Sequence, residues 1–233
     1  MKKKHSIIFL VVILAIFLFI FPVTNGQNEI PLPNPTLKGQ KSFEEVLSTR
    51  RSRRSFKEGA IALKELSQIL WASQGITSKD GKRTAPSAGA LYPLEIYVVV
   101  GEVEGLEPGI YHYDAPNHKL IRVIDKDKRS ELNLATGGGR RNIENTPVSI
   151  IITAIYGRTT KKYDQRGIRY VHIEAGAVCQ NIYLQVESLN LSTFVMGAFD
   201  DAEVKKVLAL NQNGSVLGGE VEPILIMPIG KRI

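Results

Sequence analysis

Residues 50–56 read RRSRRSF and combine four arginines with two serines in one short stretch. Guanidinium groups bind phosphate oxygens in pairs, and serine hydroxyls add donors without bulk. The stretch is therefore a candidate phosphate site. A solvated charge cluster, or a basic patch that binds polyanions, would use the same residue types.

Residues 85–94, APSAGALYPL, place small side chains between two prolines. Small residues let the backbone approach a flat ring closely, and free backbone amides can donate hydrogen bonds to it. An ordinary turn before a strand is the alternative.

Two further segments near the C-terminus could contribute to a site of the same kind. In FVMGAF, Met196 and Gly197 stand where a strand meets a loop, which is a second position for close approach. Plain core packing would explain this segment as well. The chain closes on PIGKR, whose Lys231 and Arg232 form either a second basic cluster or a solvated tail.

Other chemistries lack their motifs in this sequence. There is no GxSxG, no GxGxxG after a strand and no Walker pattern, so serine hydrolysis and the common nucleotide-binding folds are unsupported. The four histidines lack ligand spacing such as HExxH, and Cys179 is the only cysteine. We therefore expect no disulfide within the chain and no bound metal.

The bulk composition allows a single domain with a sizeable core. The chain has 233 residues, is 43% hydrophobic and carries a net charge of +7. Three of those charges are the lysines at positions 2–4, so the excess in the remainder is modest. We therefore expect no nucleic-acid partner.

The N-terminus has the pattern of an export segment. Three lysines precede an unbroken apolar run over residues 7–23, and small and polar residues follow. This pattern is typical of a secretory signal peptide, and the run also reaches the lower limit for a spanning helix. Lysines on the N-terminal side would keep that end cytoplasmic. The sequence therefore predicts an exported or membrane-anchored protein with its domain on the extracytoplasmic side.

Three regions follow from these patterns. Residues 1–26 are expected to be the signal peptide or membrane anchor. Residues 27–40 contain PLPNP, which favours an extended tether because each proline disfavours helix at its own position and at the one before. Residues 41–233 are expected to form the folded domain.

The elements of that domain mix helices and strands without strict alternation, which indicates an α+β fold. The helix at 173–189 is apolar nearly all round, which favours burial. Apolar spacing and caps predict helices at 42–50, 63–75, 127–134, 173–189 and 201–210. Apolar and β-branched runs predict strands at 96–100, 109–113, 120–124, 148–155, 193–196 and 223–227.

The segments RRSRRSF, PSAGALYP, IEAGAVCQNIYLQVESLNL with VMGAF, and PIGKR resemble, in this order, the nitroreductase superfamily. The most similar branch is that of the SagB-type, thiazole/oxazole-forming oxidoreductases. The resemblance implies a central mixed or antiparallel sheet flanked by helices. It also implies a homodimer with a long buried central helix, and FMN bound at the subunit interface.

The resemblance assigns roles to the residues named above. Arg50, Arg51, Ser52 and Arg54 would hold the FMN phosphate and ribityl chain, joined by Lys231 or Arg232. Arg53 and Ser55 would be the solvent-facing remainder of this stretch. Pro86, Ser87 and Ala88 would come from the partner subunit and pack on the dimethylbenzene side of the ring. Met196 and Gly197 would line the isoalloxazine, where a backbone amide toward N5 tunes hydride transfer.

Residues 160–170, TKKYDQRGIRY, resemble the Lys-Tyr element of the azoline-oxidising branch. The matching pair is Lys162 and Tyr163, which would assist proton removal as hydride leaves for the flavin. A desolvated lysine can serve as a base because burial lowers its pKa. A surface loop with two lysines is the alternative.

The function implied is an FMN-dependent oxidoreductase that transfers hydride to or from flavin N5. NAD(P)H is one candidate electron donor, and the substrate would be a small molecule or a peptide. Two alternatives stay open: a catalytically idle flavin-binding module tethered to a membrane, and an azoline-to-azole dehydrogenase that acts on a peptide. A polyanion-binding surface protein is a third, outside the flavoproteins.

Overall fold

The computed structural model describes residues 28–138, 143–210 and 219–233. The expected signal peptide or anchor, residues 1–26, therefore lies outside the described residues. Within the described part of the chain, no helix is both long and apolar enough to cross a membrane.

A seven-stranded sheet in the order β1-β6-β5-β3-β7-β9-β8 forms the centre of the fold, and each neighbouring pair is antiparallel. The expected α+β fold with a central sheet is confirmed, in its antiparallel form. The strands are β1 (Glu29–Pro31), β3 (Leu94–Val100), β5 (Gly109–Asp114), β6 (Lys119–Ile124), β7 (Val148–Ala154), β8 (Leu191–Thr193) and β9 (Glu222–Lys231). Two short strands, β2 (Ile61–Ala62) and β4 (Val103–Glu104), form a separate parallel pair.

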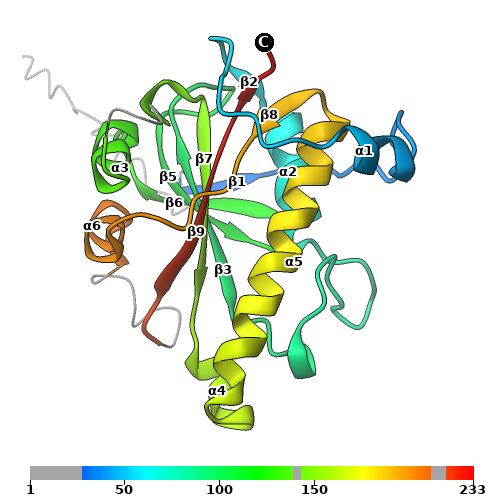
Figure 1. Ribbon diagram of the computed structural model, residues 1–233, viewed down its shortest axis with the longest axis vertical. Coiled ribbons are helices and arrows are strands. Elements are labelled where there is room, and N and C mark those ends of the chain that lie inside the picture. The colour runs from blue at the N-terminus through cyan, green and yellow to red at the C-terminus, as the bar shows by residue number, and fades with distance from the viewer. Residues whose placement is uncertain (1–27, 139–142, 211–218) are drawn as a thin grey trace, which may run out of the picture.

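Helices cover both faces of the sheet (Figure 1). They are α1 (Phe43–Thr49), α2 (Leu63–Gln74), α3 (Arg129–Ala135), α4 (Gly157–Tyr163), α5 (Arg166–Ser188) and α6 (Asp201–Val207). The core on one face includes residues of α2 and α5, and the core on the other includes residues of α3 and α6. This is why β3 and β7 are apolar at nearly every position.

Local signals in the sequence account for several helix ends. Ser42 caps α1 by accepting from the amide of Glu45 at 3.1 Å, and Asp200 caps α6 in the same way. Gly75 ends α2, where a Cβ would lie 2.2 Å from the ring of Trp71, so no larger residue fits.

The long central helix α5 begins earlier than the sequence indicates, at Arg166 rather than 173. Val171, Ala175, Val178 and Ile182 recur at helical spacing on its buried face. The opposite face is exposed in the single chain, where Ile173 keeps 62% of its surface in solvent. The apolar character of this helix predicted that it would be buried. Within one chain, only one of its faces is buried.

The segment expected to be a tether, residues 27–40, is extended but does not stand apart from the domain. Glu29–Pro31 pairs with β6 as an edge strand, and Leu32 is buried in the core. The carbonyl of Pro33 accepts hydrogen bonds from Ser67 and from His118, at 2.6 and 3.0 Å. The folded domain therefore begins before residue 41, because this segment pairs with β6, packs in the core and accepts hydrogen bonds at the carbonyl of Pro33.

Candidate active site

The arginine-rich segment lies beside the C-terminal ends of α5 and β9, at the same end of the molecule as the C-terminus (Figure 1). The amide of Arg53 donates to the carbonyl of Thr193 in β8 at 2.9 Å, and the amide of Lys57 donates to that of Lys231 at 3.0 Å. Residues 50–57 therefore lie against β8 and the C-terminal end of β9, although these segments are far apart in the sequence.

Tyr183 of α5 joins the arginine segment to the FVMGAF segment. Its hydroxyl accepts from the amide of Val195 at 2.9 Å and shares a hydrogen bond with the hydroxyl of Ser52, also at 2.9 Å. The Tyr183 ring also supports Arg50, whose guanidinium carbon lies 5.2 Å from the ring centroid. The segment expected to bind the phosphate and the FVMGAF segment are therefore neighbours.

Several cations of this surface have no carboxylate partner among the residues that the structure describes. Arg51 donates only to backbone carbonyls, and Arg54 lies over the ring of Phe194, 5.5 Å from its centroid. The unpaired cations here are Arg50, Arg51, Arg54 and Lys231. A set of cations and one hydroxyl without bound carboxylates fits a phosphate dianion.

Glu187 forms ion pairs with two other cations of this surface, Arg53 and Arg232. This carboxylate is 2% exposed and accepts from Arg53 at 2.5 Å and from Arg232 at 2.9 Å. Burial acts to raise the pKa of Glu187, but the hydrogen bond from Arg53 and the charge of Arg232 outweigh it and hold the pKa below its usual range. The expectation that Arg53 faces solvent is wrong, because it neutralises this buried acid.

Met196 and Gly197 occupy different environments. Met196 is buried, and its amide and carbonyl both bond to Ile226 of β9, at 2.8 and 2.9 Å. Gly197 is exposed, and its amide has no partner within the described chain. Of the two amides at Met196 and Gly197, only that of Gly197 is available to a ring nitrogen, because the amide of Met196 is already bonded.

The segment containing Pro86, Ser87 and Ala88 forms a tight turn with a short 3₁₀ helix at Ala88–Ala90. Three of its residues have positive φ: Gly89 at 64°, Ala90 at 54° and Tyr92 at 44°. The hydroxyl of Ser87 accepts from the amide of Tyr92 at 2.9 Å, which closes the turn. A non-glycine residue in the left-handed backbone conformation costs about 1–2 kcal/mol of folding free energy. Contacts with the surrounding residues must therefore hold the turn in place.

Glu174 of α5 makes one such contact, although it belongs to none of the motifs recognised in the sequence. Its side chain is 2% exposed, bonds to Ser87 and accepts from Gln74 of α2 at 3.4 Å. Burial raises the pKa of Glu174. The available signal was a glutamate on the helix face that also carries Val171, Ala175 and Val178.

Lys162 and Tyr163 lie on helix α4, not on a loop, and both reach this turn. A Cβ added at Gly89 would lie 2.8 Å from the hydroxyl of Tyr163 and 3.1 Å from Nζ of Lys162. Lys162 is exposed, and its Nζ lies 5.3 Å from the centroid of the Tyr163 ring. The pair and the turn therefore form a second group of candidate residues.

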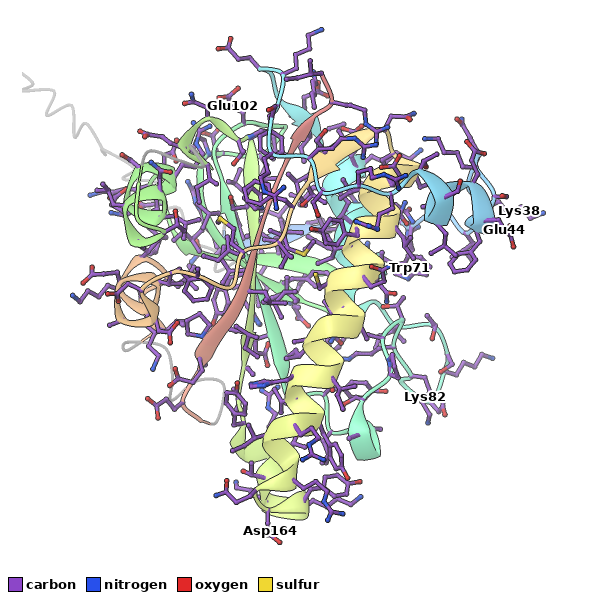
Figure 2. All side chains as sticks on the ribbon, in the orientation of Figure 1. Lys38, Glu44, Trp71, Lys82, Glu102 and Asp164 are labelled. Atoms are coloured by element: carbon purple, nitrogen blue, oxygen red, sulfur yellow. The ribbon has the colours of Figure 1, made fainter. Side chains whose placement is uncertain are left out.

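The two groups stand at opposite ends of α5. Ser87 contacts α5 at Glu174, whereas Ser52 contacts it at Tyr183, nine residues and about 14 Å farther along the axis. Figure 2 labels Asp164 at the tip where α4 passes into α5, at the end of the molecule away from the C-terminus. One chain does not bring all the expected ligands together. Within the described residues, no cluster of histidine, cysteine or acidic side chains could hold a metal ion.

An antiparallel sheet covered on both faces, with a long central helix and these two groups at its ends, defines a nitroreductase-type α+β domain. The chain belongs to the nitroreductase family, whose model matches residues 47–231. This confirms the family predicted from the motifs. Members of the family are typically flavin-dependent oxidoreductases.

Among its relatives, a protein of Methanocaldococcus jannaschii described as a nitroreductase is 42% identical over 205 residues, covering 88% of this chain and 97% of that one. The microcin B17-processing protein McbC of Escherichia coli is 26% identical over 153 residues, covering 64% of this chain and 54% of its own.

Solved structures share the fold. A nitroreductase-family structure from Ralstonia eutropha has a TM-score of 0.73 at 29% identity, covering 88% of this chain and 90% of that one. The NADPH:FMN oxidoreductase of Vibrio harveyi, solved with NAD+, has a TM-score of 0.56 at 19% identity, covering 81% of this chain and 67% of its own.

Proposed function

We propose that the protein is an FMN-dependent oxidoreductase that transfers hydride to or from flavin N5. The observation that supports this proposal is the junction at Tyr183, whose hydroxyl bonds to Ser52 of the cationic segment and to the amide of Val195, two residues before Gly197. A phosphate site and a ring-facing amide side by side are what a flavin mononucleotide requires. FMN, when bound, supplies the hydride chemistry.

The chain's own residues then bind and orient the cofactor. Arg50, Arg51 and Arg54 would neutralise the phosphate, with Lys231 beside them, while Ser52 would add a hydroxyl. Arg232 would support this surface through Glu187 rather than by direct contact, because its guanidinium already bonds to Glu187 and to the carbonyl of Leu191. The amide of Gly197 would face the ring.

We propose a homodimer as the form that completes the site. The turn at Pro86, Ser87 and Ala88 lies about 14 Å along α5 from Ser52, so the turn of a second subunit would cover the ring. The exposed face of α5 around Ile173 is the surface that such a partner would cover. NAD(P)H remains the candidate electron donor, supported by the named activity of the Vibrio relative.

A second candidate function, oxidation of an azoline in a peptide, is favoured by the placement of Lys162 and Tyr163. Both side chains lie against the turn that would face the ring, and a lysine beside a tyrosine can move a proton as hydride leaves. The likeness to McbC, a microcin B17-processing protein, points to the same chemistry. A peptide azoline would then be the substrate.

The decisive experiment compares FMN with riboflavin, which lacks the phosphate. The full-length protein is purified, its bound flavin is identified, and the Kd for both flavins is measured. We expect Arg54→Ala to weaken FMN by roughly tenfold or more, the range for lost charge-assisted hydrogen bonds, while riboflavin affinity stays unchanged. Lys126→Ala, an exposed lysine after β6, is the matched control.

The outcomes separate the alternatives. Bleaching of bound flavin by NADPH supports the oxidoreductase, and bound flavin that no donor reduces supports the idle module. Loss of azoline oxidation in Lys162→Ala, with flavin affinity intact, supports the peptide substrate. Protein that binds neither flavin, but binds DNA with a steep salt dependence, supports the polyanion binder.

We further propose that the domain is exported or anchored through residues 7–23 on the extracytoplasmic side. The lysines at positions 2–4 followed by an apolar run support this orientation. Because β1 begins at Glu29, an uncleaved anchor would hold the domain within about 20 Å of the membrane. External protease added to intact cells should digest the domain, and protection of the domain would contradict the proposal.

A further inference from the structure

A small cavity opens where β3 and β5 part at one end of the sheet. The β3–β5 ladder stops at the pair Tyr97–His112, whereas β3 continues to Leu94 alongside β7. The cavity has a volume of about 260 Å³ and lies in this splay. Gln74 at the end of α2 and Arg83 on the following loop line its other side.

Arg83 presents an unused hydrogen-bonding edge there. Nη1 donates to Oε1 of Gln74 at 3.0 Å, and the guanidinium stacks on Tyr92 with its carbon 4.3 Å from the ring centroid. Nε is buried without a hydrogen-bond partner, and Nη2 has none among the residues described. Nε and Nη2 form the edge that binds a carboxylate through two parallel hydrogen bonds.

Lys82, the residue before Arg83, lies in a different environment. Lys82 projects into solvent on the same loop (Figure 2), and it pairs with Asp80 at 2.8 Å. Arg83 turns inward instead, and burial lowers its pKa. Of these two adjacent cations, Lys82 is neutralised at the surface, whereas Arg83 is half-buried and has no carboxylate partner among the described residues.

Carboxylates near the cavity are occupied or screened from Arg83. Glu95 bonds to His112 at one oxygen and pairs with Arg158 at the other, both at 2.6 Å. Glu174 is separated from Arg83 by Gln74, which donates to it at 3.4 Å. The remaining acid of the wall, Asp114, bonds to Asn117 at 2.9 Å and lies 3.6 Å from Lys119.

We propose that this cavity is a binding site for a short aliphatic carboxylate, whose two oxygens bond to Nε and Nη2 of Arg83. The volume suits a ligand of a few heavy atoms, below the usual range for drug-sized ligands. Leu94, Ile96 and Pro116 supply an apolar wall for its carbon chain. The cavity adjoins the turn at residues 85–92, because Arg83 stacks on Tyr92. None of the residues proposed to bind the flavin lines the cavity, so neither proposal depends on the other.

The test titrates the full-length protein with sodium butyrate by calorimetry at constant ionic strength, with butyramide as the neutral isostere. We expect saturable binding of butyrate, and binding of butyramide that is weaker by roughly tenfold or more. Arg83→Gln should weaken butyrate by a similar factor. Arg83→Lys keeps the charge but not the planar edge, so it should give an intermediate loss.

Arg122→Gln is the matched control, because Arg122 also lies over a tyrosine and bonds to a backbone carbonyl but stands outside the cavity. Circular dichroism checks the folding of each variant, and Arg83→Lys serves if Arg83→Gln does not fold. The proposal is overturned if butyrate does not saturate, if butyramide binds as tightly, or if Arg122→Gln weakens binding as much as the Arg83 variants do.

Discussion

The hydroxyl of Tyr163 rests against Gly89, so closely that a single methyl group at position 89 would lie 2.8 Å from it. Gly89 also has a φ of 64°, in the left-handed region where a Cβ is disfavoured. Both the local backbone and its neighbour on α4 therefore require glycine. This contact fixes where the Lys162–Tyr163 pair stands relative to the turn.

Gly89→Ala should displace Tyr163 and cost about 1–2 kcal/mol of unfolding free energy. Tyr163 lies edge-on to Tyr170, with ring centroids 5.1 Å apart, so its displacement should shift the Tyr170 ring protons in an NMR spectrum. Gly81→Ala is the control, since Gly81 has a φ of 80° but open space around it. It should lose similar stability and leave the Tyr170 signals in place; identical spectra for both variants would contradict the prediction.

Glu187→Gln should destabilise the protein by about 1–3 kcal/mol at pH 7, because it removes the charge that pairs with Arg53 and Arg232. The folded-state pKa of Glu187 is depressed below its ordinary value of 4.5. Its contribution is therefore present above pH 4.5 and is lost as the pH falls through the folded-state pKa. Urea unfolding of wild type and variant should show a stability gap that closes in acid. A gap independent of pH would rule out the charge as its source.

Cys179 should resist alkylation in the native protein. The thiol is 9% exposed, and burial raises its pKa to about 11 although Arg50 opposes the shift. At pH 8 roughly one thiol in a thousand would be ionised, and only the thiolate reacts. Iodoacetamide should label the native protein at least a hundredfold more slowly than the urea-unfolded chain, as followed by mass spectrometry. Comparable rates would show that the thiol is accessible.

Ile173→Glu should break the proposed dimer, because it places a charge on the exposed face of α5 where the partner would pack. Light scattering after gel filtration should report a dimer for the wild type and a monomer for this variant. Leu134→Glu, at a residue of α3 that is 71% exposed, should leave the dimer intact. A monomeric wild type at micromolar concentration would remove the basis for a site shared between subunits.

The sheet could be predicted from the sequence because its strands are apolar runs separated by turn residues. The run expected at 148–155 is β7, and the hairpin expected at 109–124 is β5 and β6. The first turns of α5 could not be predicted, because the stretch from Arg166 to Tyr170 is mostly exposed and lacks an apolar period.

The candidate site could be predicted only in part from the sequence. The composition of the short segments identifies its small residues and arginines as candidates, but the partners of these residues are distant in the chain. Arg53 lies 134 residues from Glu187, and Gln74 lies 100 residues from Glu174. Local patterns contain no information about such pairs, so a charged residue that neutralises a buried acid looks the same as one that faces water.

The N-terminal strand also protects the edge of the sheet. Exposed edge strands offer unpaired backbone groups to other molecules, and short edges that end in proline reduce that risk. β1 has three residues and ends at Pro31, and the opposite edge, β8, is equally short. A shortened chain that begins after Pro35 would lose β1 and leave the six-residue β6 as a bare edge. Such a product should aggregate through strand pairing between molecules, whereas a chain that begins before Glu29 should remain dispersed.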